Sequence, residues 1–172
     1  MTQFEIKDGV AIIPEGTTEI PFRAFINCED LTTVVIPDSV TCIVNGAFFG
    51  CSSLTEIVIP NSVTSIGAGA FSHCSSLKNI VIPNSVTQIG YNAFGFCTSL
   101  TNIVIPNSVT SIGAGAFSRC YSLKNVVVPN GVTSIGDRAF CCAPGRKLVI
   151  RNIRKLVTEK EPTTVTNTSS LT

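Results

Sequence analysis

The feature that most constrains the fold of this chain is a motif that recurs every 23 residues without a gap. Five near-identical copies begin at Leu31, Leu54, Leu77, Leu100 and Leu123. A degenerate first copy, residues 8–30, keeps Pro14, Ile20, Ala24, Phe25 and Cys28 in register. Self-similarity at a fixed period of about 20–50 residues indicates a repeat architecture, in which each copy forms one layer of a solenoid.

Each copy carries the pattern of one β-strand followed by a turn. In the copy that begins at Leu54, Ile57 and Ile59 alternate as strand residues do, and Pro60 ends the strand because proline cannot donate to a ladder. A single copy cannot bury its own apolar side chains, so the copies must stack, and equivalent residues then lie on one another. The stack predicts an isoleucine ladder and a phenylalanine ladder. The isoleucine ladder consists of Ile20, Ile43, Ile66, Ile89, Ile112 and Ile135. The phenylalanine ladder consists of Phe25, Phe48, Phe71, Phe94, Phe117 and Phe140.

The repeated unit L-x-x-I-x-I-P-x-S-V-T-x-I-G-x-x-A-F-x-x-C-x-S resembles the BspA-like class of leucine-rich repeats over about residues 8–142. The resemblance implies a right-handed leucine-rich-repeat solenoid. We expect a parallel β-sheet on the concave face, short turns or 3-10 segments on the convex side, and little regular α-helix. Members of this class are often surface or secreted proteins implicated in adhesion and protein binding, so the resemblance implies such a role here.

The repeat also predicts how the chain is divided. Residues 1–7 are expected to form an N-terminal cap segment, and residues 8–150 the solenoid. The solenoid has about six repeats and a partial seventh strand at 146–150, where the pattern slips by one residue. Residues 151–172 form a C-terminal segment, and its Thr- and Ser-rich part from about residue 162 is expected to be disordered.

No pattern of chemically active residues points to catalysis. Five cysteines recur with the repeat, which indicates one buried structural role rather than a metal site: Cys28, Cys51, Cys74, Cys97 and Cys120. Cys42, Cys141 and Cys142 are irregular, and His73 occupies a variable surface position. The IGAGAF segments resemble a phosphate loop but recur as turns of the repeat, and no hydrolase or nucleotide-binding motif occurs. We therefore expect neither an enzyme nor a cofactor.

Charge is divided between the two ends of the chain. Residues 1–56 hold eight acidic and two basic residues, residues 57–136 hold three basic residues and no acid, and residues 137–172 hold three acidic and seven basic residues. This pattern is typical of two soluble caps, and it also permits end-to-end self-association.

The sequence favours some partners and compartments over others. With two tyrosines and no tryptophan, the chain does not suit nucleic-acid binding. No apolar run is long enough for a membrane span, and the first residues do not resemble a signal peptide. The compartment stays open: the family resemblance suggests the surface or secretion, whereas unpaired cysteines favour a reducing compartment.

The strand positions between core residues give the candidate binding surface. They should place a valine row beside an asparagine-rich row on the concave sheet, almost without charge: Val35, Val58, Val81, Val104 and Val127, with Asn79, Asn102 and Asn125. An exposed contiguous apolar ridge suggests a partner. The alternative is that valine is present for its β-propensity and the ridge is idle. Residues that differ between copies offer a second surface: Tyr91, Asn92, Phe96, Tyr121, Asp137 and Arg138.

These features together favour a non-catalytic protein-protein interaction module. If it follows its class, it is adhesin-like and binds a protein partner of unknown identity through the concave sheet or the repeat-variable positions. The alternative is an intracellular scaffold or a self-assembling structural protein.

Overall fold

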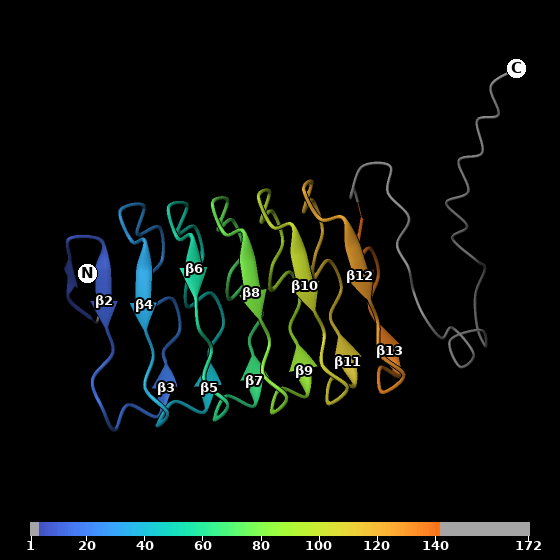
Figure 1. The fold of residues 1–172 in the computed structure, drawn as a ribbon, viewed down its shortest axis with the longest axis horizontal. Helices are drawn as coiled ribbons and strands as arrows, with labels where there is room; N and C mark the ends of the chain where they lie inside the picture. The colour runs from blue at the N-terminus through green and yellow to red at the C-terminus, as the bar shows by residue number, and fades with distance from the viewer. Residues whose placement is uncertain (1–3, 142–172) are drawn as a thin grey trace, which may run out of the picture.

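The computed structural model describes residues 4–141 as a stack of six rungs, with two rows of short strands along its length (Figure 1). One row consists of β1 (Ile6–Lys7), β2 (Val10–Ile12), β4 (Thr33–Val35), β6 (Glu56–Ile57), β8 (Asn79–Val81), β10 (Asn102–Val104) and β12 (Asn125–Val127). The other consists of β3 (Glu19–Ile20), β5 (Cys42–Ile43), β7 (Ser65–Ile66), β9 (Gln88–Ile89), β11 (Ser111–Ile112) and β13 (Ser134–Ile135). No helix occurs in the described residues, so the expected solenoid of parallel β-structure is confirmed.

The first row is the parallel sheet that the alternation of isoleucines predicted. Strands β2, β4 and β6 pair in parallel, as do β8, β10 and β12, and an isolated bridge between Val58 and Val81 joins the two groups. Each residue lies opposite its equivalent one repeat away, as Val104 does opposite Val81 and Val127. At the N-terminal end, β1 pairs antiparallel with β2 and covers the edge of the sheet.

The second row is a six-stranded parallel sheet that the sequence did not predict. Its strands hold two residues each, too few to show an alternating pattern, so only the stacking of rungs turns them into a sheet. Threonine side chains reinforce the stacking, because the hydroxyls of Thr41, Thr64, Thr110 and Thr133 each donate to the threonine carbonyl of the preceding rung. Thr64 Oγ1 donates to Thr41 O at 3.3 Å, and Thr133 Oγ1 donates to Thr110 O at 3.2 Å.

The third side of each rung is a run of turns, as the sequence indicated. We define the turn face as residues 21–27, 44–50, 67–73, 90–96, 113–119 and 136–141. Neighbouring rungs are joined there by backbone hydrogen bonds, such as Phe48 N to Ala70 O at 2.8 Å.

Two turn-face positions adopt the left-handed region, the first in all six rungs and the second in the first five. The first set is Arg23, Gly46, Gly69, Asn92, Gly115 and Arg138, and the second is Asn27, Gly50, His73, Phe96 and Arg119. Each residue of the second set donates its N–H to a carbonyl of the next rung. The backbone geometry at each position is therefore common to these rungs, although the side chains differ.

The core between these three sides contains the predicted phenylalanine ladder. Successive rings stack with centroids 5.1–5.3 Å apart from Phe25 to Phe140. Phe4 adds a ring that the sequence did not predict, 5.5 Å from Phe25. The ladder cysteines Cys51, Cys74, Cys97 and Cys120 are fully buried as expected. Cys28, which was also expected to be buried, is only half-buried, because it lies in the first rung of the described stack and no rung precedes it there.

The predicted seventh strand at 146–150, the C-terminal segment 151–172 and Cys142 lie outside the described residues, so the proposed division of the chain stays a prediction.

Candidate binding surfaces

The valine row predicted from the sequence is a continuous exposed ridge on the first sheet. Val58, Val81 and Val104 expose 72%, 71% and 70% of their surface, and Val35 and Val127 about half. Ile12 extends the ridge to the first rung and is also exposed. We call these six residues the valine ridge. Its exposure follows from strand alternation, because the neighbours Ile80 and Ile82 turn into the core.

Asparagine side chains lie beside the ridge where the sequence placed them. Asn79 and Asn102 are exposed, and Asn125 lies opposite Asn102 on β12. Thr101 Oγ1 accepts from Asn102 Nδ2 at 3.2 Å, donates to Lys78 O at 3.2 Å, and lies 3.4 Å from Asn79 Oδ1. The threonine hydroxyl therefore contacts the amides of two asparagines in adjacent rungs.

A second row of asparagines flanks the other side of the ridge. It follows the proline that ends each strand and consists of the exposed residues Asn61, Asn84, Asn107 and Asn130. These residues were not predicted as part of the candidate binding surface. Their recurrence every 23 residues, two positions beyond the strand's last core residue, was the signal that could have found them.

The ridge and both asparagine rows meet in a shallow, open depression of about 490 Å³ between β10 and β12. Its lining includes Val104 and Val127 from the ridge, Asn102 from one row, and Asn107 and Asn130 from the other. The surface thus combines an apolar centre with polar edges, an arrangement typical of protein interfaces.

The turn face carries the residues that differ between rungs. His73, an exposed variable residue as expected, stacks on Phe96 with centroids 4.2 Å apart, and lies 5.2 Å from Phe49. The guanidinium of Arg119 lies 4.9 Å from the centre of the Phe96 ring. Tyr91 is also strongly exposed. The face therefore displays aromatic and cationic groups, which the valine ridge lacks.

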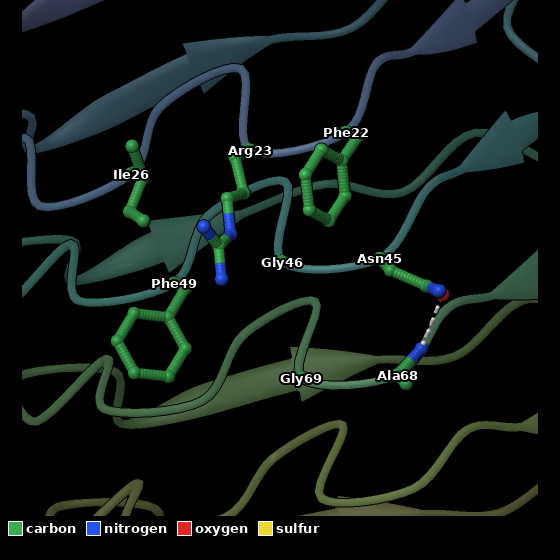
Figure 2. Close-up of a pocket in the computed structure, with 8 residues that line it drawn as sticks. All are labelled: Phe22, Arg23, Ile26, Asn45, Gly46, Phe49, Ala68 and Gly69. Carbon is green, nitrogen blue, oxygen red and sulfur yellow. Dashed lines mark hydrogen bonds between the residues drawn. The ribbon is translucent and has the colours of Figure 1, made fainter.

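At the N-terminal end of the turn face, eight residues line a small pocket of about 170 Å³ (Figure 2). They are Phe22, Arg23, Ile26, Asn45, Gly46, Phe49, Ala68 and Gly69. The repeat pattern predicted no functional role for these positions. Phe22, Arg23 and Ile26 lie in the degenerate first copy, where nothing distinguishes a functional substitution from loss of the consensus, so no sequence signal pointed to them.

Within residues 4–141, no group of three or more His, Cys, Asp or Glu residues could hold a metal ion. The same part of the chain holds no helix long and apolar enough to cross a membrane.

The stacked parallel strands and the 23-residue register define a β-solenoid of the leucine-rich-repeat class. Residues 3–156 match the family described as BspA type leucine rich repeat region, in six copies. The chain therefore belongs to the BspA-type leucine-rich-repeat family. A comparison with curated proteins found no match.

Among solved structures, the chain is similar to a leucine-rich repeat protein of T. pallidum, with 30% identity, a TM-score of 0.67 and 78% of each chain covered. It is also similar to one from Bacteroides ovatus, with 31% identity, a TM-score of 0.61, and 77% of this chain and 43% of that chain covered. A third is a leucine rich cell surface protein of Faecalibacterium prausnitzii, with 30% identity and a TM-score of 0.58. There the match covers 81% of this chain and 46% of that one. The match thus spans less than half the length of the second and third proteins.

Proposed function

We propose that this chain is a non-catalytic module that binds a protein partner through the valine ridge and its flanking asparagines. The observation that carries the proposal is the exposure of six apolar side chains in one unbroken row. Full burial of a valine side chain stabilises a folded protein or a complex by up to roughly 1.5–3 kcal/mol. A partner that covers the row of water-exposed valines would therefore gain binding free energy.

The polar edges support the same role. The asparagine amides both donate and accept, so they can pair with the backbone of a partner without introducing a charge at the interface. Glu56 is the one charged residue in the asparagine-rich row of the described strands. The solenoid's extended sheet surface is the kind of surface that repeat proteins use for binding.

The test is a double substitution of the ridge, Val81→Lys with Val104→Lys. Both side chains point to solvent, so the variant should fold with an unchanged circular dichroism spectrum and unfolding midpoint, while two cations interrupt the apolar row. Gln88→Lys with Ser134→Lys is the matched control, because it adds the same charge to exposed positions of the second sheet. Partners cross-linked to the wild-type chain on intact cells should be lost with the ridge variant and kept with the control. Equal capture by a folded ridge variant would refute the proposal.

We further propose that the module acts outside the cell, as an adhesin-like protein. The support is the family together with one similar protein whose name calls it a cell surface protein. Protease treatment of intact source cells should cleave the chain before lysis. Cleavage only after lysis would contradict this location and favour the intracellular scaffold, without touching the proposal for the ridge.

A further inference from the structure

The pocket on the turn face has apolar walls and a floor without side chains. Phe22, Ile26 and Phe49 form the walls, and Phe22 exposes 61% of its surface. The floor includes Gly46 and Gly69, both in the left-handed region. A Cβ built on Gly69 would meet no atom closer than 3.9 Å, so the hollow exists because glycine occupies this position.

Arg23 is the unusual residue of the pocket. Its φ is 55°, at a position where the next rungs have Gly46, Gly69 and Asn92. A residue other than glycine or asparagine in this region carries backbone strain of about 1–2 kcal/mol. Figure 2 shows the side chain extending across the pocket toward Phe49, and the guanidinium lies 4.9 Å from the centre of the Phe22 ring. No carboxylate among residues 4–141 forms an ion pair with it.

The polar side chains of the lining offer donors to a ligand. The backbone N–H groups of Arg23, Gly46 and Gly69 are all bonded to carbonyls of the next rung. Asn45 Oδ1 accepts from the backbone N of Ala68 at 2.8 Å, which leaves the amide nitrogen of Asn45 unused. The lining side chains therefore offer the amide nitrogen and the guanidinium, both of which donate.

We propose that this pocket binds the C-terminal residue of a partner polypeptide, with an apolar side chain against the rings and its α-carboxylate on Arg23. A carboxylate only accepts, so it matches the two side-chain donors, and arginine pairs with it through two parallel hydrogen bonds. Sugar hydroxyls would need acceptors as well, which the lining side chains do not supply. The volume of about 170 Å³ suits one side chain and excludes a helix. The site is separate from the valine ridge.

Fluorescence polarisation with a labelled pentapeptide that ends in phenylalanine tests this proposal. We expect the free acid to bind at least tenfold more tightly than the same peptide with an amidated C-terminus, a difference of about 1.4 kcal/mol. Arg23→Asn should cause a similar loss for the free acid. Asparagine tolerates the left-handed region, so this variant relieves strain and should remain folded.

Two further variants complete the design. Arg138→Asn is the matched control, because it makes the same change at the equivalent position of the last rung and should leave binding unchanged. Gly69→Asn keeps Arg23 and copies the residue found at Asn92, but fills the floor, and should also weaken binding at least tenfold. Equal binding of acid and amide, unchanged binding by Arg23→Asn, or no binding at millimolar peptide would overturn the proposal. Equally tight binding of an amidated peptide with an internal glutamate, or of glucuronate, would overturn the assignment to a C-terminus.

Discussion

At the scale of single residues, the ladder cysteines are potentially reactive groups that have a structural role in the core. Each thiol donates to a phenylalanine carbonyl of the preceding rung, as Cys74 does to Phe48 O at 3.2 Å and Cys97 to Phe71 O at 3.1 Å. Burial raises the pKa of these two thiols well above the usual value of 9.0, and that of Cys51 to about 12. A thiolate is the reactive form, so these cysteines are inert in the folded chain.

The raised pKa values make stability depend on pH. Below pH 9 the thiols are protonated in both the folded and the unfolded chain, and their full contribution is present. Above pH 9 the unfolded chain loses these protons while the folded chain keeps them, so the free energy of unfolding should fall as pH rises toward 12. Each buried thiol adds up to about 1.4 kcal/mol per pH unit to the slope.

Urea unfolding between pH 7 and pH 10.5, under reducing conditions, measures this slope. Cys74→Ala with Cys97→Ala should lower stability at every pH but give a shallower decline above pH 9. Val86→Ala, a core truncation without a thiol, should keep the slope of the wild-type chain. If the free energy of unfolding fell with the same slope above pH 9 in all three proteins, the buried thiols would not be the cause of the decline.

Strand alternation allowed the residues of the valine ridge to be predicted from the sequence, because a period of two places Val81 opposite in direction to Ile80 and Ile82. The place of Arg23 in the turn-face pocket could not be predicted in this way. Its effect depends on a left-handed backbone, on glycines one and two rungs away, and on the ring of Phe22 beside it. A residue pattern within one repeat copy encodes none of these relations.

At the scale of elements, three features cover or block the N-terminal end of the stack. The hairpin of β1 and β2 covers the edge of the first sheet, and Phe4 covers Phe25, the first ring of the ladder. In the second sheet, Val44 and Gly67 each donate their N–H to an isoleucine carbonyl of the preceding rung. The equivalent residue of the first rung is Pro21, which has no N–H to leave unpaired. These devices disfavour strand addition at this end.

Removing the ring that covers the ladder should cost less than removing one from its middle. Phe4 is half-buried and stacks on one side only, so Phe4→Ala should destabilise the chain by about 1–2 kcal/mol. Phe71 is fully buried between two rings, and Phe71→Ala should cost about 3–5 kcal/mol. Urea denaturation at pH 7 compares the two. A larger loss for Phe4→Ala would show that the cap, rather than the ladder, limits stability.

The second sheet marks the limit of prediction at this scale. Its inward residues, such as Ile66 and Ile89, were identified as core from the repeat, and they are buried. Strand character in a segment of two residues comes from hydrogen bonds to equivalent segments 23 residues away, which propensity and periodicity within one copy do not encode.

At the scale of the whole molecule, a stack of equivalent rungs should tolerate the removal of one whole rung. Deleting residues 77–99 joins two rungs in register, so the shortened chain should fold and unfold cooperatively at a lower urea midpoint. Its m-value should fall by about one sixth, because it follows the surface exposed on unfolding. Deleting residues 77–98 should be far more damaging, since every later side chain shifts by one position. Similar stability of the two deletions would contradict a fixed register.

The second left-handed position of the turn face has a consequence for how such proteins diversify. Asparagine, glycine, histidine, phenylalanine and arginine occupy it in successive rungs, with backbone N–H···O distances of 2.7–2.9 Å throughout. The scaffold supplies the geometry, and the side chain is free to vary. A single-codon change can therefore alter the side chain that this surface displays without a change in rung length. A library randomised at these sites would sample new specificities on one constant framework.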